Sequence, residues 1–200
     1  MQLEAVRQWW VGTGHRNRVT RAIELRIATA RGLAIDVGGG REAAHDRAWH
    51  PSVHRIRLDL SALHGPDLRA DASALPMEDE SVDVVLMVQV LEHLSDPERA
   101  CHEAWRVLKP EGLFVGSVPF VYPVHGDPHD YYRFSEDGLR HILRSFEIVD
   151  IEPLGSALSG AWLLLASRSR IWRLLNPVMR GVGNKADPRS PESYVFTARK

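Results

Sequence analysis

The sequence predicts a single α/β domain in which mostly parallel strands alternate with helices, and three observations lead to this prediction. Short apolar runs such as residues 84–87 are typical of strands that are covered on both faces. Amphipathic patterns with the period of a helix separate several of these runs. The 200 residues, of which 44% are hydrophobic, suffice for one substantial core and are too few for two ordinary domains. We therefore expect residues 1–200 to form one domain.

The first half of the chain is expected to form one helix and four strands. In residues 16–30, Val19, Ile23 and Ile27 recur every four positions while arginines occupy the other faces, which is typical of an amphipathic helix. Gly32 is expected to end this helix, because glycine readily adopts the left-handed conformation found there. Apolar and β-branched runs predict the four strands at residues 33–37, 53–60, 67–70 and 82–88.

The second half continues the alternation. Asp96 and Pro97 are expected to start a helix that runs to about residue 108, because aspartate accepts hydrogen bonds from free backbone amides and proline suits the first helical position. Ser135 is expected to cap another helix. Residues 109–112 contain proline and glycine and predict a turn. The remaining strands are predicted at residues 113–118, 146–151 and 194–198.

Residues 154–193 depart from the alternation and predict a helical insertion before the last strand, as residues 1–31 predict an N-terminal helical segment. The run 154–167 carries no charge and is too short to cross a membrane, which takes about 20 apolar residues. Three arginines then accompany Trp172, namely Arg168, Arg170 and Arg173. Two interpretations stay open: a helix packed on the domain, or a basic helix that lies on a membrane surface and gives peripheral contact through residues 154–180.

Composition argues against several classes of protein. The formal net charge of −1 gives no overall attraction to nucleic acid, and no aromatic and basic platform accompanies the arginines of the first helix, so we expect no nucleic-acid partner. Cys101 is the single cysteine, so no disulfide can form within the chain. Residues 1–10 lack the apolar stretch and cleavage site of a signal peptide, and we expect a cytoplasmic protein.

Candidate ligand-binding residues follow three of the predicted strands. Asp36 and the glycines at 38–40 follow the first strand, Asp59 ends the second and Asp71 follows the third. An open parallel sheet binds ligands beyond the carboxyl ends of its strands, where glycines allow close approach of the backbone. A carboxylate about 20 residues after a glycine turn can accept hydrogen bonds from both ribose hydroxyls. Each residue alone could be a solvated or packing residue, but together they predict an adenosine pocket.

Four short motifs then occur in a characteristic order: DASALP at 71–76, SVDVV at 81–85, VLEHL at 90–94 and RVLKPEG at 106–112. This order resembles the class I S-adenosylmethionine-dependent methyltransferases, and most closely their type 11 group. The resemblance covers about residues 34–118, and residues 194–200 resemble the final strand of the family. It implies a Rossmann-like seven-stranded sheet with the last strand antiparallel, S-adenosylmethionine as the cofactor, and methyl transfer as the activity. A dehydrogenase fits less well, because the glycines lack the G-x-G-x-x-G spacing.

The resemblance also implies roles for individual residues. By position, Asp59 would bind the ribose, and Gln89 would lie beside the sulfonium. Glu42 stands where the family often has another glycine. Glu42 could be a favourable charge at a helix N-terminus, or it could crowd the cofactor carboxylate. In the second case a non-catalytic nucleotide- or partner-binding protein on the same fold is the alternative. The methionine end would be lined by Asp36, Gly38 and Gly40, and the adenine by Asp71 and Ala72.

Residues 119–134 lie where the family has its acceptor pocket and mix aromatic with titratable side chains, as a substrate lid does. They contain a P-x-D-Y-Y-R-F element that is similar to one in type 11 members of bacterial glycan and lipid-linked saccharide pathways. We therefore expect a small-molecule, glycan or lipid-linked acceptor. His125 or His129 is the predicted base, because the pKa of histidine suits removal of a hydroxyl proton. The residues predicted to orient the substrate are Tyr131, Tyr132 and Arg133.

Two other interpretations of this stretch stay open. In the first, it is a structural loop in which Arg133 pairs with a neighbouring carboxylate and the tyrosines pack. In the second, His125, Asp127, His129 and Asp130 share a metal ion. We predict no metal, because prolines interrupt this stretch and no second cluster is evident. His93 is expected to be a structural or pocket-wall histidine.

Overall fold

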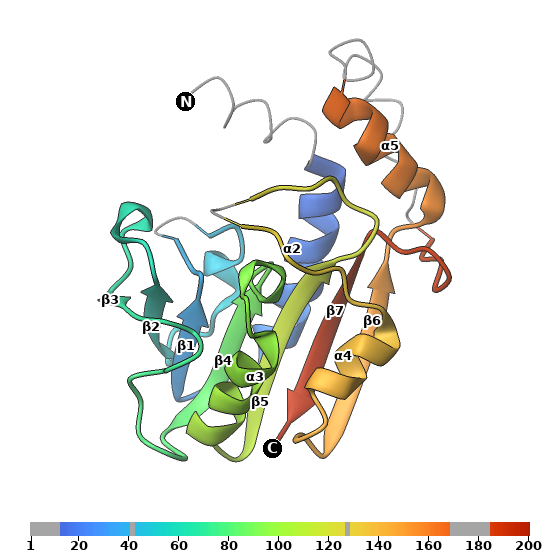
Figure 1. The fold of residues 1–200 in the computed structure, drawn as a ribbon. Helices are drawn as coiled ribbons and strands as arrows, with labels where there is room; N and C mark the ends of the chain where they lie inside the picture. Colours follow the sequence, from blue (N-terminus) through green and yellow to red (C-terminus); the bar gives the residue numbers. More distant parts are fainter. Residues whose placement is uncertain (1–12, 41–42, 127–128, 169–184) are drawn as a thin grey trace.

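Seven strands form one sheet in the order β3-β2-β1-β4-β5-β7-β6 (Figure 1). The computed structural model describes residues 13–40, 43–126, 129–168 and 185–200. β7 is antiparallel to both of its neighbours, and the other strands run parallel to one another. This arrangement confirms the predicted fold class. The strands are β1 (Leu33–Val37), β2 (His54–Asp59), β3 (Leu68–Arg69), β4 (Val82–Val88), β5 (Leu108–Pro119), β6 (Ile148–Leu154) and β7 (Ser193–Arg199).

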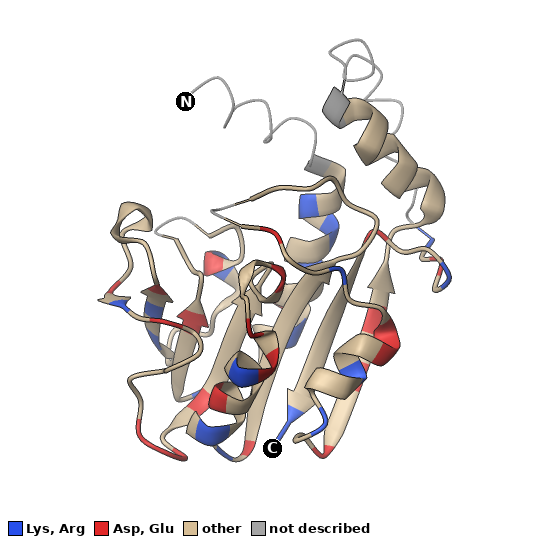
Figure 2. Ribbon diagram, viewed as in Figure 1, with Lys and Arg blue, Asp and Glu red and all other residues tan. Residues whose placement is uncertain are grey.

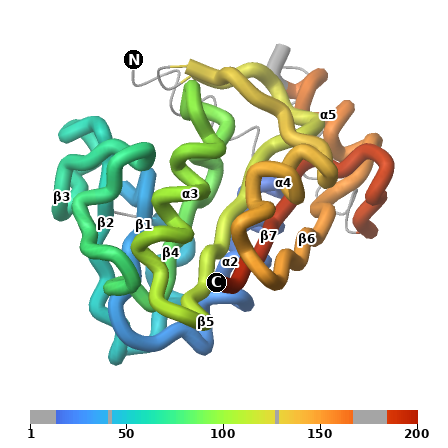
Figure 3. Tube along the Cα trace, turned by 60° about the horizontal axis from the view of Figure 1, so that its bottom comes forward, coloured from blue at the N-terminus to red at the C-terminus, as the bar shows by residue number. Residues whose placement is uncertain are grey.

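Helices cover both faces of the sheet. α3 and α4 lie on one face and α2 on the other (Figures 1 and 3). On β4, Val85 and Met87 face α3, whereas Val84 and Leu86 face the opposite way, as the two-residue period of a strand requires. The α-helices are α2 (Thr13–Ile27), α3 (Pro97–Val107), α4 (Glu136–Ile142) and α5 (Ala157–Arg168), and the 3-10 helices are η1 (Asp46–Ala48), η2 (Ala62–His64) and η3 (Leu91–His93).

The apolar stripe of α2 anchors this helix to the sheet. Ile23 and Ile27 are fully buried against Leu86 and Val195 of the central strands. Burying each isoleucine side chain contributes about 1.5–3 kcal/mol to folding. The helix therefore runs beside the carboxyl ends of β1 and β4 in a fixed position and can present its first turns to a ligand.

Side chains cap the N-termini of α3 and α4, as predicted. Asp96 accepts a hydrogen bond from the amide of Arg99 at 3.0 Å, and Pro97 is the first residue of α3. The hydroxyl of Ser135 accepts from the amide of Gly138 at 3.2 Å at the start of α4. These caps supply partners for backbone amides that a helix leaves free.

Two predicted details are wrong. α2 ends at Ile27, before Gly32, which instead precedes β1 with φ +81° and leaves room for the carboxylate of Asp83. Residues 109–112 do not separate a helix from a strand, because β5 already begins at Leu108. They form an irregularity within β5, where the pairing with β4 shifts register. Helix propensity and turn residues alone do not report such tertiary pairing.

α5 begins the segment that precedes β7. Leu163 and Ala166 are buried, and Gly160 lies so close to Val121 that a β-carbon there would be 2.5 Å from the Cγ1 atom of that valine. Leu158, Leu164 and Leu165 of the same helix are exposed, and residues 157–166 carry no charge, in agreement with the tan turns in Figure 2. The predicted basic face depends on Arg168, Arg170 and Arg173. The side chain of Arg168 and the whole of residues 170–173 lie outside the described part of the chain. Within the described part of the chain, every helix is too short or too polar to span a bilayer.

Candidate cofactor and acceptor site

Two adjoining pockets lie at the carboxyl ends of the parallel strands, where an open sheet binds its ligands. The first has a volume of about 580 Å³ and the second about 490 Å³. Val37, Gly38 and Gln89 line both of them. The two pockets therefore meet at the ends of β1 and β4, and one extended ligand can reach from one into the other.

The glycine loop after β1 forms the wall between β1 and the first pocket. Gly38 has φ +74°, and its amide donates to the carbonyl of Leu58 at 2.7 Å. A β-carbon on Gly38 would lie only 2.5 Å from Cγ2 of Val90. Glycine is therefore required here both for the backbone conformation and for the close approach of η3.

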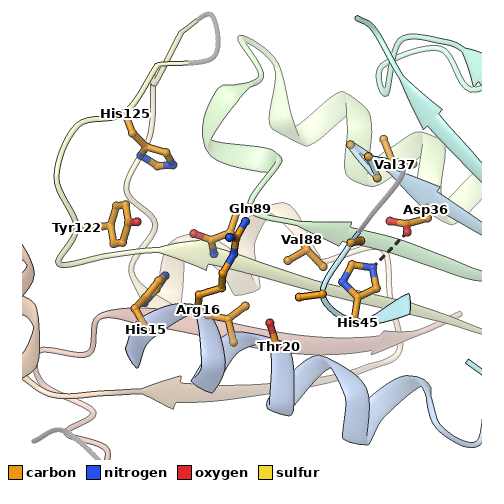
Figure 4. A pocket seen from close by; sticks show the side chains of 16 residues that line it. His15, Arg16, Thr20, Asp36, Val37, His45, Val88, Gln89, Tyr122 and His125 are labelled. Atoms are coloured by element: carbon orange, nitrogen blue, oxygen red, sulfur yellow. Dashed lines mark hydrogen bonds and ion pairs between the residues drawn. The ribbon is translucent and has the colours of Figure 1, made fainter. Parts of the chain in front are cut away.

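Asp36 is buried beneath this loop, and its carboxylate interacts with the side chains of His45 and Arg55. Nε2 of His45 lies 3.2 Å from its Oδ2 atom, and Nη1 of Arg55 lies 3.5 Å from the same oxygen. Figure 4 shows Asp36 and His45 at one end of the first pocket. Asp36, Gly38 and Gly40, the residues predicted for the methionine end, all line this pocket.

The second pocket collects the residues predicted for the nucleoside. Asp59, Asp71 and Ala72 line it together with Gly38 and Gln89. Asp59 accepts from the amide of Ser61 at 2.7 Å and pairs with Nδ1 of His64 at 2.9 Å, which fixes its orientation at the end of β2. Asp71 accepts from the amide of Ser73 at 2.8 Å.

Gln89 lies where the two pockets meet. Its φ of +55° is unusual for a residue other than glycine, and such strained residues concentrate at functional sites. Its backbone amide donates to the carbonyl of Ser117 at 3.0 Å, and its side-chain amide donates to the hydroxyl of the same serine at 3.1 Å. Both acceptors belong to Ser117 near the end of β5, so this neighbouring strand holds the glutamine in its conformation.

His125 lies at the other end of the first pocket. Figure 4 shows it with Tyr122 and His15 on the side opposite Asp36, while Gln89 and Arg16 lie between the two ends. The rings of Tyr122 and His125 are 5.0 Å apart. Burial, together with the imidazole of His93, lowers the pKa of His125.

Of the five residues predicted for the acceptor side, the described pockets include only His125. Arg133 makes two hydrogen bonds to Asp130, at 2.5 and 2.7 Å, and lowers the pKa of that carboxyl to about 2. The hydroxyl of Tyr132 donates to the carbonyl of Ser95 at 3.1 Å. Arg133 therefore stabilises the loop through a neighbouring carboxylate, which is the structural interpretation left open above.

The other two acceptor-side residues are exposed. Tyr131 is 50% exposed, and His129 contributes its carbonyl oxygen to a hydrogen bond with His93. Asp127 and Glu42 lie outside the described residues. The metal site predicted with Asp127 and the crowding of the cofactor carboxylate by Glu42 therefore stay predictions.

A family model described as a methyltransferase domain matches residues 11–116, which is more than half of the chain. The chain belongs to this family. The predicted family is thereby confirmed, and the match covers α2, the glycine loop and the strands that carry both pockets of the methyltransferase domain.

Relatives agree with this membership. A probable S-adenosylmethionine-dependent methyltransferase of Mycolicibacterium smegmatis is 42% identical over 76 residues, which are 38% of this chain and 25% of the relative. An uncharacterized methyltransferase of Mycolicibacterium vanbaalenii is 47% identical over 121 residues, 54% of this chain and 45% of the relative. The chain thus spans less than half the length of these relatives.

A solved structure shows the same fold across nearly the whole chain. It is a SAM-dependent methyltransferase of Thermotoga maritima, described as a possible histamine N-methyltransferase, and it is 20% identical. The alignment covers 98% of this chain and 95% of the Thermotoga chain, with a TM-score of 0.69. At this level of identity the likeness concerns the Rossmann-like fold of the methyltransferase domain and not its acceptor.

Sequence reasoning missed several residues that line the site of the methyltransferase domain. His15 and Arg16 come from α2, and Tyr122 comes from the loop after β5. The helical pattern of residues 16–30 predicted α2, but no sequence signal reports that its first turn faces the glycine loop. Only the packing of α2 against β5 and β7 brings these side chains to the pocket.

Glu92 was also missed, although it lies within the VLEHL motif. Its side chain is fully buried on η3, and burial raises the pKa of the carboxyl to about 8. Nε2 of His93 lies 3.8 Å and Nε2 of His125 lies 3.9 Å from its Oε1 atom. His93 lines the second pocket, in agreement with its predicted place in a pocket wall. Sequence spacing could not show that His125 lies beside Glu92 and His93.

Proposed function

We propose that this chain binds S-adenosylmethionine across the two pockets and transfers its methyl group to a small-molecule, glycan or lipid-linked acceptor. The observation that carries the proposal is the convergence of the glycine loop, Asp59 and Asp71 on two pockets that meet at Gln89. When bound, the cofactor supplies an electrophilic methyl group on a sulfonium. The residues of the chain bind it, align the acceptor and remove a proton.

The residues around the pockets fit the parts of this cofactor. The carboxylate of Asp59, held by Ser61 and His64, can accept hydrogen bonds from the ribose hydroxyls. Gly38 lines both pockets, so the ligand would pass this residue between them. Asp36 and Gly40 line the pocket that would hold the methionine end. Methyl transfer is an in-line displacement, so catalysis depends mainly on this alignment.

His125 is the proposed base for a hydroxyl acceptor. Its Nδ1 atom lies 3.3 Å from the carbonyl oxygen of Pro123, which can only accept, so the proton resides on Nδ1 and the lone pair on Nε2. The lowered pKa keeps the imidazole neutral near pH 7, as removal of a proton requires. Tyr131, which is half exposed, and Tyr132 lie on the same loop and would contact the far end of a larger acceptor.

Titration calorimetry with S-adenosylmethionine and S-adenosylhomocysteine tests the proposed cofactor. We expect saturable binding that weakens at least about tenfold in Asp59→Ala, since charge-assisted hydrogen bonds contribute about 1.5–3 kcal/mol. Asp67→Ala, which removes a carboxylate that pairs with Arg57 outside both pockets, is the control and should bind normally. Absence of binding to either ligand would favour the alternative, a non-catalytic partner-binding protein on this fold.

Turnover assays then separate binding from catalysis. With sugars and lipid-linked intermediates as acceptors, His125→Ala should lower kcat by about 10²- to 10⁴-fold, the usual range for a general base. S-adenosylhomocysteine binding of the same variant should remain close to that of the wild type. Unchanged turnover in His125→Ala would refute the role of this base.

We also propose that the protein is cytoplasmic and that α5 brings it to the inner face of the membrane. Leu158 and Leu165 are 61% and 44% exposed on a helix that carries no charge before Arg168. Exposed leucines of this kind add apolar area that can enter the interface of a bilayer. Co-sedimentation with vesicles of anionic lipid should decrease in the double variant Leu158→Ser, Leu165→Ser. Leu25→Ser, which changes an exposed leucine of α2, is the control, and equal sedimentation of all three would exclude this contact.

A further inference from the structure

A buried carboxylate without a partner lies between the two pockets. The Glu92 side chain has no exposed surface, and neither of its oxygens accepts a hydrogen bond from another described residue. A buried polar group that makes no hydrogen bond is destabilising unless something compensates for it. Such a group therefore indicates a missing partner.

Two imidazoles present nitrogen lone pairs to this carboxylate. Nδ1 of His93 lies 2.6 Å from the carbonyl oxygen of His129, and Nδ1 of His125 lies 3.3 Å from that of Pro123. Because a carbonyl oxygen can only accept, both Nδ1 atoms donate, and in the neutral imidazoles the lone pairs are on the Nε2 atoms. These Nε2 atoms are the ones that lie 3.8 and 3.9 Å from Oε1 of Glu92.

The surroundings of the histidines are those of metal ligands. A histidine that binds a metal usually donates its other N–H to a carbonyl or carboxylate, which fixes the ring. His93 has a carbonyl there, and His125 has both a carbonyl and the carboxylate of Asp130, whose Oδ2 lies 3.4 Å from Nδ1. The rings of His93 and His125 are 4.9 Å apart and nearly perpendicular.

A second group of potential ligands differs in a decisive way. Asp36, His45 and Asp46 also lie close together. However, Asp36 is bonded to His45, and Arg55 pairs with both aspartates, at 3.5 Å from Asp36 and 2.5 Å from Asp46. The cation of Arg55 already compensates for these carboxylates, whereas Glu92 has no comparable partner.

We propose that Glu92, His93 and His125 bind a divalent transition-metal ion of the Zn²⁺ type. Their three ligand atoms lie within 4.8 Å of one another. Tetrahedral zinc with bonds near 2.1 Å places its ligand atoms roughly 3.4 Å apart, so side-chain movements of well under 1 Å suffice. Two imidazoles select a transition metal over Mg²⁺ or Ca²⁺, which favour oxygen ligands.

The position of this site suggests what the ion would do. Three protein ligands leave a fourth coordination position open, as in catalytic zinc sites. His125 lines the first pocket and His93 the second, so the ion would lie where the pockets meet. There it could bind the oxygen of an acceptor hydroxyl and lower its pKa, and the hydroxyl proton would leave to solvent instead of to His125. This role rests on the proposed methyl transfer, whereas binding of the ion does not.

Titration of the metal-stripped protein with Co²⁺ and Zn²⁺ tests the site. We expect one ion per chain by calorimetry, and visible Co²⁺ bands of a four- or five-coordinate ion. Glu92→Gln, His93→Ala and His125→Ala should each weaken binding at least tenfold. His141→Ala is the control, because this exposed histidine on α4 lies outside both pockets, and it should bind like the wild type.

Denaturant unfolding of the metal-free proteins shows whether a variant has merely lost its fold. Glu92→Gln keeps the size and shape of the buried side chain, so it should unfold at about the same urea concentration as the wild type. Binding that is as tight in Glu92→Gln as in the wild type would indicate surface histidines and overturn the proposal, as would the absence of saturable binding. Cofactor binding is measured separately on metal-free protein. If the cofactor did not bind, the metal titration would still show whether Glu92, His93 and His125 bind an ion.

Discussion

Replacing Gly38 by alanine tests how the glycine loop is built. Alanine in the left-handed conformation costs about 1–2 kcal/mol, and Gly38 has φ +74°. The new β-carbon would lie 2.5 Å from Cγ2 of Val90, so η3 or the loop must move, at a further cost of about 1–3 kcal/mol. We therefore expect a loss of about 2–5 kcal/mol in the free energy of unfolding, or a fall in Tm of roughly 5–20 °C.

Urea unfolding followed by circular dichroism measures this loss, and calorimetry with S-adenosylhomocysteine measures its effect on the pockets. Gly138→Ala is the matched control, because a β-carbon there meets only the Ser135 hydroxyl at 3.4 Å and alanine favours a helix. That variant should be as stable as the wild type or more stable. If Gly38→Ala unfolded within about 0.5 kcal/mol of the wild type, the argument from φ and the Val90 contact would be refuted.

Three further predictions concern groups outside the pockets. Arg133→Met should destabilise the protein by about 3 kcal/mol in urea unfolding, because it leaves the buried carboxylate of Asp130 unpaired, and a change below about 1 kcal/mol would contradict this. Arg106 lowers the pKa of Glu103 by hydrogen bonding, so this pair stabilises the fold above the ordinary pKa of a glutamate and loses its effect as pH falls through the lowered value. The difference in stability between the wild type and Glu103→Gln should therefore shrink below about pH 4, and a constant difference would refute the coupling. Burial raises the pKa of the Cys101 thiol to about 12, so a thiol reagent should label the protein only as fast as it unfolds, and rapid labelling of native protein would show the burial to be incorrect.

The elements of the fold could be predicted where local chemistry determines them. The apolar runs gave β1 and β4 with the observed bounds, and Asp96 and Ser135 capped their helices as their side chains allow. The errors came from tertiary effects. Gly32 directly precedes β1, where a side chain would collide with Asp83. Residues 109–112 belong to β5, whose pairing with β4 shifts register there.

The cofactor side of the site could be predicted better than the acceptor side, for a physical reason. Residues at the ends of parallel strands meet at one edge whatever the loops do, so Asp59 and Gly38 come together by topology. The loop after β5 has no such constraint. Its Arg133 pairs with Asp130, and only the packing of η3 reveals that His125 lies beside Glu92, 33 residues away in the sequence.

The place of β7 also has a consequence for synthesis on the ribosome. In the sheet, β6 pairs with β7 alone, and β7 fills the position between β5 and β6. Roughly 40 residues separate the end of β6 from the start of β7, which at about 5–20 residues per second is a delay of roughly 2–8 s. During this delay β5 and β6 cannot yet be joined, and the backbone N–H and C=O groups that later pair with β7 are open to chaperones or to other nascent chains. β7 is translated after the other six strands of this sheet, yet it takes a position inside the sheet and not at its edge.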